Sequence, residues 1–273
     1  MKKATVKDVE NFWSKNPLFT GEVEYDLAHP NKFFKSHDEV YFNDVLWGVN
    51  IESTFYLPNK KNITLDLGCG IGFWSNLFVN HFSIKNLYSA DLTNEALKIC
   101  KLRVPKTKVI KENAEKLSFK SSTFDHVNCQ GVIHHTPDTQ ACLNEIYRVM
   151  KPDATASISV YYKNYLLMFA NNFLPVIKIF AKLLLRDTGR GRDFTKVKNL
   201  NDLVRYYDGN KNPIGKAYSK DHYENMLIRA GFKNIEFQYF FFPFRFLKLR
   251  LPKFFKTFLL KFFPFMIVAN LKK

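Results

Sequence analysis

Residues 63–75 read ITLDLGCGIGFWS, and this stretch decides how the rest of the sequence is interpreted. It begins with alternating apolar residues and an acid, which is the pattern of a β-strand, and continues with glycines at positions 68, 70 and 72. One glycine is enough for a tight turn, so three indicate that several groups approach this backbone closely. A glycine-rich turn that leads from a strand into a helix lets backbone N–H groups approach a ligand.

Outward from this turn, short apolar runs alternate with helical segments. The strand-like runs are 62–69, 86–92, 108–114, 124–133 and 155–162, and the helical runs are 73–82, 93–104 and 138–150. This alternation predicts an α/β fold, in which a doubly wound, mostly parallel sheet carries helices on both faces.

The rhythm of strands and helices also predicts how the chain is organised. We expect residues 1–57 to form an N-terminal helical lid segment and residues 58–273 to form the main domain. Residues 161–217 interrupt the alternation and are interpreted as an insertion after the fifth strand. The pattern resumes with a helix over 219–230 that stops at Gly231.

Two cofactor classes compete for the glycine-rich turn. Dinucleotide sites need a third small residue for close helix–strand packing, but Phe73 stands at that position here. S-adenosylmethionine has no pyrophosphate and carries a cationic amino group that favours a carboxylate partner. Asp66, two residues before Gly68, is placed to supply that carboxylate, so the second class is preferred.

Further polar residues stand where later strands end. Asp91 ends the second strand, where a carboxylate can accept hydrogen bonds from both hydroxyls of a ribose. Asn113 and Ala114 follow the third strand, where the adenine edge is expected, and Gln130 ends the fourth. These positions meet at one edge of a parallel sheet, so they are expected to line one ligand site.

At these residues the chain resembles a class I S-adenosylmethionine-dependent methyltransferase of the type 11 group, which contains ubiquinone and menaquinone methyltransferases. The resemblance rests on DLGCGIG, SADL, ENAEKLSF, FDHVNCQGVIHHTPD and EIYRVMKPDA, and covers roughly residues 60–160. It implies a Rossmann-like, seven-stranded sheet and S-adenosylmethionine as cofactor. The implied cofactor-binding residues are Asp66, Gly68, Cys69, Gly70, Asp91, Leu92, Asn113, Ala114 and Gln130. Asn113 departs from the family, which usually has Asp there, so altered affinity is expected.

Methyl transfer from a sulfonium mainly requires alignment, and it requires a base only when the acceptor must lose a proton. His134 and His135 follow the fourth strand, where acceptor and cofactor meet, and are the candidate catalytic residues; the alternative is that they shape the loop. Phe12, Trp13 and Tyr25 are candidates to close over the cofactor, or to pack within the lid.

The composition suggests partners and a compartment. Lys and Arg outnumber Asp and Glu by 41 to 25, and there are 28 Phe. This favours an anionic membrane surface, although the bias of an AT-rich genome also accounts for it. The four cysteines have no zinc-like spacing, so no metal is expected, and the first residues lack a secretory signal, so a cytoplasmic location is expected.

Three functions remain open from the sequence. The preferred one is methyl transfer to a small lipophilic metabolite. An RNA methyltransferase is the alternative favoured by the positive charge, although residues 130–133 read QGVI where amino-group nucleobase methyltransferases carry Asn-Pro-Pro-aromatic. A catalytically inactive S-adenosylmethionine-binding partner subunit is the third.

Residues 241–265 contain six basic residues and no acidic one. A helix is predicted from Pro252, with Lys253, Lys256 and Lys261 towards one side and phenylalanines on the other. Either these aromatics pack on the sheet, or the segment makes peripheral contact with the inner face of a membrane.

Overall fold

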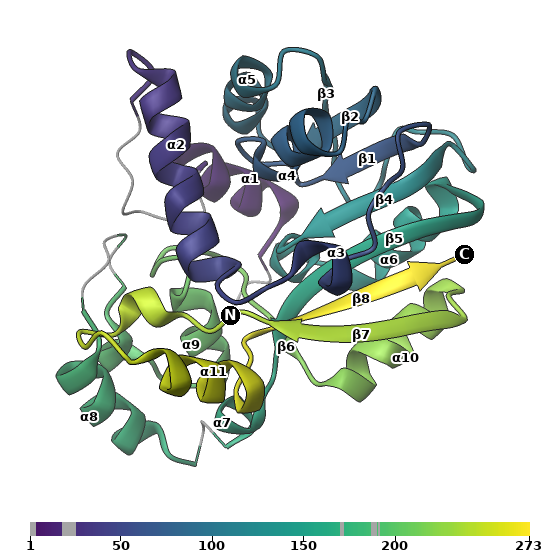
Figure 1. Cartoon of the computed structure of the whole chain (residues 1–273). Helices are drawn as coiled ribbons and strands as arrows, with labels where there is room; N and C mark the ends of the chain where they lie inside the picture. Colours follow the sequence, from purple (N-terminus) through teal and green to yellow (C-terminus); the bar gives the residue numbers. More distant parts are fainter. Residues whose placement is uncertain (1–3, 18–25, 170–171, 187–189, 191) are drawn as a thin grey trace.

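A single mixed β-sheet forms the centre of the fold (Figure 1). The computed structural model describes residues 4–17, 26–169, 172–186, 190 and 192–273. The strands are β1 (Ile63–Leu67), β2 (Asn86–Asp91), β3 (Lys108–Lys111), β4 (Phe124–Gln130), β5 (Met150–Tyr162), β6 (Ala217–Tyr218), β7 (Asn234–Phe240) and β8 (Met266–Lys272). Their order across the sheet is β3-β2-β1-β4-β5-β8-β7, and the short β6 pairs with β5 outside this order.

The strand directions confirm the predicted doubly wound sheet. β1 lies parallel to β2 and β4, and β4 lies parallel to β5. β8 runs antiparallel to both β5 and β7, so a hairpin completes one edge of the sheet. The two-residue β6 is additional to the seven predicted strands. Residues 266–271 are buried without interruption because both faces of this part of the sheet are covered.

Helices cover the two faces of the sheet (Figure 1). The α-helices are α1 (Val6–Lys15), α2 (Pro30–Val40), α3 (Ile51–Thr54), α4 (Phe73–Asn76), α5 (Asn94–Arg103), α6 (Thr139–Val149), α7 (Tyr165–Met168), α8 (Leu174–Leu184), α9 (Leu200–Tyr206), α10 (Lys220–Ala230) and α11 (Lys253–Phe262). Shorter π- or 3-10-helical turns are η1 (Tyr41–Val45), η2 (Leu77–His81), η3 (Ile133–His135), η4 (Phe194–Lys196) and η5 (Phe244–Phe246). Leu143 of α6 and Leu227 of α10 pack in one core cluster, and Trp74 of α4 and Phe78 of η2 in the other.

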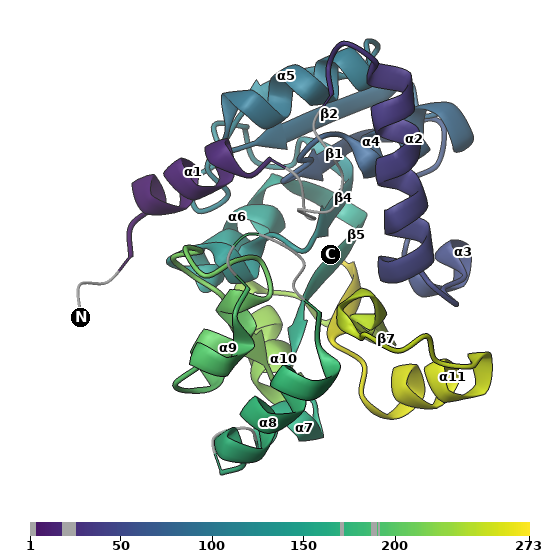
Figure 2. The ribbon, with the colours of Figure 1, turned by 90° about the vertical axis from the view of Figure 1, so that its left-hand side faces the viewer.

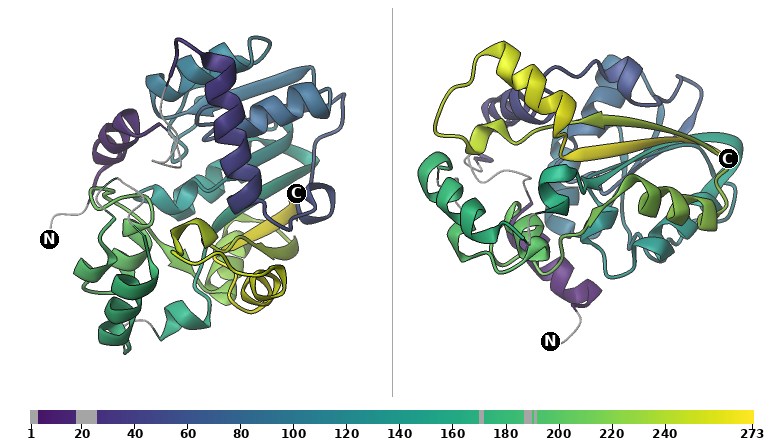
Figure 3. Two further views of the ribbon diagram at one scale, coloured as in Figure 1. Left: turned by 60° about the vertical axis from the view of Figure 1, so that its left-hand side comes forward. Right: turned by 90° about the horizontal axis from the view of Figure 1, so that it is seen from below.

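The predicted insertion leaves the sheet after β5 and returns at β6, carrying α7, α8, η4 and α9. It is joined to the segment that follows β7. The Arg186 N–H donates to the Phe246 carbonyl at 2.9 Å, and the Lys248 N–H donates to the Leu184 carbonyl at 2.8 Å. The predicted helix after Pro252 is α11. The insertion and α11 therefore gather at one end of the molecule (Figure 3, left).

The N-terminal segment lies over the carboxyl ends of the central strands, with α1 and α2 on either side (Figure 2). α1 begins with a capping box in which Thr5 and Asp8 exchange hydrogen bonds. The Lys111 ammonium contacts the Glu10 carboxylate at 2.6 Å, which joins α1 to β3.

None of the helices within the described ranges has the length and apolarity that crossing a bilayer requires.

Candidate active site

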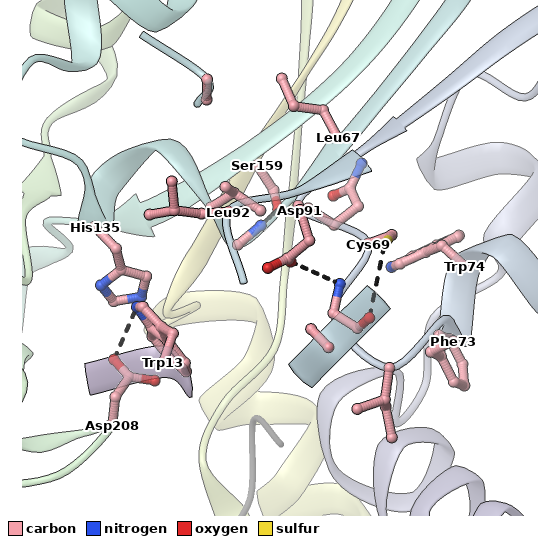
Figure 4. A pocket seen from close by; sticks show the side chains of 18 of the residues that line it. Trp13, Leu67, Cys69, Phe73, Trp74, Asp91, Leu92, His135, Ser159 and Asp208 are labelled. Carbon is pink, nitrogen blue, oxygen red and sulfur yellow. Dashed lines mark hydrogen bonds and ion pairs between the residues drawn. The ribbon is translucent and has the colours of Figure 1, made fainter. Parts of the chain in front are cut away.

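A cavity of about 240 Å³ opens at the carboxyl ends of β1, β2, β4 and β5 (Figure 4). The strand order reverses between β1 and β4 at this point, and open parallel sheets bind ligands at such a reversal. Trp13 of α1, His37 of α2 and Asp208 of the insertion line the other sides of the cavity. The strand ends, the N-terminal segment and the insertion thus enclose one site.

The three glycines of the turn meet two different demands. Gly68 has φ +72°, and a Cβ there would lie 2.2 Å from the Val132 side chain. A Cβ on Gly72, which has φ +83°, would lie 2.9 Å from the Cys100 sulfur and 3.3 Å from the Cys100 Cα, so this glycine lets α5 approach the turn. Gly70 has φ +53° and no atom within 4 Å of its missing Cβ, and it lines the cavity. Two glycines therefore allow packing within the protein, and the third keeps backbone open towards the cavity.

Asp91 holds the glycine turn against the end of β2. Its Oδ2 accepts a hydrogen bond from the Gly70 N–H at 3.1 Å, and its Oδ1 accepts from the N–H and hydroxyl of Thr93, both at 2.9 Å. A carboxylate has about four acceptor positions, so capacity remains for a ligand in the cavity that Asp91 lines. Burial raises the pKa of Asp91, although these hydrogen bonds oppose the rise.

Asp66 does not lie at the cavity wall, where the sequence predicted it. Its carboxylate does not line the cavity and is only 2% exposed. The Ser75 hydroxyl donates to one oxygen at 2.6 Å, and the Asn128 amide donates to the other at 2.8 Å. Burial raises the pKa of Asp66 to about 6. Direct contact with a cofactor ammonium, as the sequence predicted, would require this buried carboxylate to become accessible from the cavity.

The structure separates the two candidate histidines. His135 lines the cavity, whereas His134 does not. The His134 ring packs 4.0 Å from the Tyr161 ring, and neither of its nitrogens has a hydrogen-bond partner among the described residues. Burial lowers the pKa of His134 well below its usual range, so this ring is neutral. This environment favours the alternative interpretation for His134, a role in shaping the loop.

His135 belongs to a buried polar cluster at the cavity wall (Figure 4). Its Nδ1 lies 2.8 Å from the Ile214 carbonyl oxygen. Because a carbonyl only accepts, we assign the proton of the neutral ring to Nδ1, which leaves Nε2 as an acceptor. Nε2 lies 3.4 Å from Oδ2 of Asp208, and the Tyr161 hydroxyl donates to both oxygens of Asp208 at 3.0 and 3.1 Å. Nε2 and this carboxylate oxygen therefore lie next to each other at the cavity wall.

Aromatic and apolar side chains form the wall near His135. The rings of Trp13 and His135 lie 5.2 Å apart in an edge-to-face arrangement, and the Trp13 ring is also 5.1 Å from Phe12. Phe12 is buried and does not line the cavity, so of the two it is Trp13 that faces the site. Tyr25 lies outside the described residues. The remaining wall residues are Tyr161, Tyr207, Phe240, Phe241 and Met266.

Comparisons with known proteins agree with this geometry. A family model described as a methyltransferase domain matches residues 65–158. The demethylmenaquinone methyltransferase of Lactiplantibacillus plantarum is 25% identical over 205 residues, which are 71% of this chain and 79% of that protein. The human mitochondrial arginine-hydroxylase NDUFAF5 is 32% identical over 126 residues, but these cover 45% of this chain and only 34% of the human protein.

A solved structure shares the fold. It is a chain in the complex between the Haloferax volcanii Trm112 methyltransferase activator and a methyltransferase. Its TM-score is 0.58 at 14% identity, with 90% of this chain and 96% of that chain covered. The family match runs from β1 into β5 and includes the glycine turn and Asp91. Residues 65–158 match a methyltransferase domain, and the relatives support a class I S-adenosylmethionine-dependent methyltransferase.

The cavity of this methyltransferase fits the cofactor of its family. The Gln130 amide nitrogen donates to Asn128 Oδ1 and to the Ser157 carbonyl, both at 2.9 Å. These bonds fix the side chain and leave Oε1 buried without a partner in the described chain. A buried acceptor without a donor is costly, and a cationic amino group in the cavity would satisfy it. Gln130 is therefore better placed than Asp66 to face the ammonium of S-adenosylmethionine.

The other predicted cofactor residues come together at the cavity. Gly68, Cys69, Leu92, Asn113 and Ala114 all line it. The Oδ1 of Asn113 already accepts a hydrogen bond from the backbone N–H of residue 115 at 3.0 Å. A carbonyl oxygen has two lone pairs, so one remains for the adenine amino group that the resemblance implies.

Sequence reasoning missed several residues of this methyltransferase site. Asp208 carries the most chemistry among them, and it comes from an insertion in which no motif was recognised. It is one of four Asp in residues 161–217, so its presence there is no signal that it belongs to the site. Thr93 and Glu112 also line the cavity, and both lie directly beside predicted site residues in the sequence.

Proposed function

We propose that this methyltransferase acts on a small, lipophilic acceptor whose methylated atom loses a proton, and that His135 takes up that proton. The observation that carries this proposal is the continuity of the cavity. A single space contacts the glycine turn and Asp91 at one end and the aromatic wall with His135 and Asp208 at the other.

The cofactor end is assigned from the donors and acceptors that face it. S-adenosylmethionine supplies a methyl group on a positively charged sulfur. Asp91 accepts hydrogen bonds from the ribose hydroxyls, Asn113 and Ala114 contact the adenine, and Gln130 Oε1 accepts from the ammonium. Gly70 lets the backbone approach the cofactor without a side chain between them.

The proton step follows from the tautomer of His135. Transfer would break the bond between the methyl carbon and the cofactor's sulfur, which would keep the electron pair and leave as a neutral thioether. The acceptor atom X forms its bond to the methyl carbon as its X–H bond breaks, and the proton moves to Nε2 of His135. Asp208 then faces the imidazolium, and the Ile214 carbonyl keeps the ring oriented through Nδ1. Asp208 is a positioning residue, because it acts on the acceptor through the histidine.

The acceptor class is inferred from the wall around His135. Trp13, Phe240, Phe241 and Met266 present apolar surface, and such surface favours an acceptor with a large apolar part. A relative of this chain is named a demethylmenaquinone methyltransferase, which agrees with a lipophilic acceptor. We also propose that residues 1–57 act as a lid and residues 161–217 as the acceptor-side insertion, because they supply Trp13 and Asp208 respectively.

The acceptor class is tested by incubating the purified protein with S-adenosylmethionine labelled in its methyl group and an extract of the producing cells. Label in the organic phase is the expected result. Label in RNA would overturn the proposal in favour of the alternative acceptor. Cofactor binding without transfer to any fraction would indicate an inactive partner subunit.

The role of His135 is tested once an acceptor is known. His135→Ala is expected to lower kcat by about a hundredfold while cofactor affinity stays nearly constant. Asp208→Asn is expected to lower kcat less and to shift the pH profile of kcat, because it changes the field on the histidine. His134→Phe is the matched control, since it alters the neighbouring ring outside the cavity. Equal losses in the two histidine variants would contradict the assignment.

A further inference from the structure

Three helices expose an unusual amount of apolar surface. Tyr165 of α7 is 65% exposed, Leu183 of α8 is 63% exposed and Phe254 of α11 is 66% exposed. The other large apolar side chains exposed on or beside these helices are Leu166, Met168, Phe169, Phe173, Val176, Ile179, Phe180, Leu184, Leu249, Phe255, Phe258 and Phe262. Scattered exposed apolar residues are normal, but a concentration of this size marks an interaction surface.

Hydrogen bonds connect the three helices into one face, which we call the α7–α8–α11 face. The Asn164 side chain, at the start of α7, donates to the Phe263 and Pro264 carbonyls at the end of α11. At the other end of α8, Leu185 forms a β-bridge with Leu247. Figures 1 and 3 both draw the three helices at the same end of the molecule. The exposed side chains thus belong to one continuous end of the fold.

The charge of this face has one sign. Residues 163–186 contain four Lys or Arg and residues 246–263 contain five, and neither range contains Asp or Glu. Lys182, Lys253 and Lys261 are exposed among the apolar side chains. A second copy of the chain would bring the same positive charge against this face, so self-association is disfavoured. A partner that is complementary to this face therefore carries both apolar and negatively charged groups.

We propose that the α7–α8–α11 face docks this methyltransferase onto an anionic lipid bilayer. The apolar side chains enter the boundary between headgroups and acyl chains, and the lysines contact the lipid phosphates. Tyr161 and Met266 of the cavity wall lie within three residues of the Asn164 and Pro264 contacts that anchor this face. The apolar end of the cavity is therefore connected to the membrane-facing end by short segments of chain.

Vesicle binding tests this proposal without any methyl acceptor, so its outcome is independent of the proposed reaction. The full-length protein is mixed with phosphatidylcholine vesicles, with or without phosphatidylglycerol, and sedimented. Binding is expected to need phosphatidylglycerol and to weaken with added salt. Equal binding to both kinds of vesicle, or to neither, would overturn the proposal.

Two charge variants locate the contact. The triple change Lys182→Glu, Lys253→Glu and Lys261→Glu is expected to lower the partition coefficient at least about tenfold. The matched control makes the same change in net charge at Lys60, Lys85 and Lys106, which are exposed just before β1, β2 and β3 at the opposite end of the sheet. An equal loss in the control would show attraction by net charge alone and would overturn the assignment to this face.

A conservative variant gives a second readout that does not depend on the stability of the triple variant. Phe254→Trp places an indole at the most exposed phenylalanine of α11. Its emission, measured as the difference from the unsubstituted protein, is expected to shift to shorter wavelength when phosphatidylglycerol vesicles are added. No shift, or self-association of the protein without lipid, would favour a protein partner for this face and overturn the proposal.

Discussion

Replacing Asp66 with Asn is expected to change how stability depends on pH. The carboxylate is buried behind the glycine turn, where it accepts hydrogen bonds from Ser75 and Asn128. Burial raises its pKa from 3.8 to about 6, more than the two hydrogen bonds lower it. The folded protein therefore favours the protonated form of this group, and ionising it costs stability.

The size and the sign of the expected change in stability follow from the shift in the pKa of Asp66. A rise from 3.8 to about 6 corresponds to about 3 kcal/mol, because one unit of pKa is about 1.4 kcal/mol. The folded-state pKa is the higher one, so the wild-type protein loses this stability as the pH rises from about 4 to about 6, and carries the full cost above that. Asp66→Asn removes the free-energy cost of the buried carboxylate at neutral pH. Below about pH 4 the wild-type group is protonated, so the variant has no such advantage in stability there.

Urea denaturation at a series of pH values measures the effect. The quantity of interest is the free energy of unfolding of Asp66→Asn minus that of the wild type. It should increase by about 3 kcal/mol between about pH 4 and pH 8, since any change in hydrogen bonding adds an offset that does not vary with pH. A difference that stays constant across this range would refute the reasoning.

Asp125→Asn is the matched control. Burial pushes the pKa of Asp125 up, but hydrogen bonds from Lys151 and from the Ile63 N–H together hold it below its usual value. The ionised form is therefore the favoured one in the folded protein. This variant should lose stability relative to the wild type as the pH rises through the folded pKa towards the unfolded value of 3.8, and the difference should then stay constant, so the control should be nearly flat between about pH 4 and pH 8.

Two further predictions concern the glycine turn. Asp91→Ala should lower the affinity for S-adenosylmethionine at least about tenfold in calorimetry, because hydrogen bonds to a charged group contribute about 1.5 to 3 kcal/mol each; unchanged affinity would remove Asp91 from the ribose site. Gly68→Ala should lower the urea midpoint, because its Cβ would lie 2.2 Å from Val132 in a backbone with φ +72°. Adding Val132→Ala should restore part of the loss, and no recovery would show that backbone strain alone is responsible.

The cofactor end of the site was predictable because its residues follow strands directly. Gly70, Asp91 and Gln130 lie at or just after β1, β2 and β4, and the parallel topology brings those ends together. Asp66 has the same local signal. Its partners come from α4 and β4, so its burial depends on packing between elements that the local sequence does not show.

The acceptor end was less predictable. His134 and His135 are neighbours in the turn η3, and the direction in which each ring points depends on the geometry of that turn. Asp208 reaches His135 from 73 residues further along the chain, through a segment without a recognised motif. Tertiary contacts of this kind leave no periodic pattern in a single sequence.

The hydrogen bonds between residues 184–186 and 246–248 have a consequence for recombining this chain with its relatives. A chimera that exchanges only the segment between β5 and β6 would carry over half of this pairing and leave backbone groups of the recipient without partners. Exchanging the segment between β7 and β8 at the same time preserves the pairing. Grafting experiments, and natural gene exchange that yields a folded product, should therefore treat these two separate stretches of the gene as one transplantable unit.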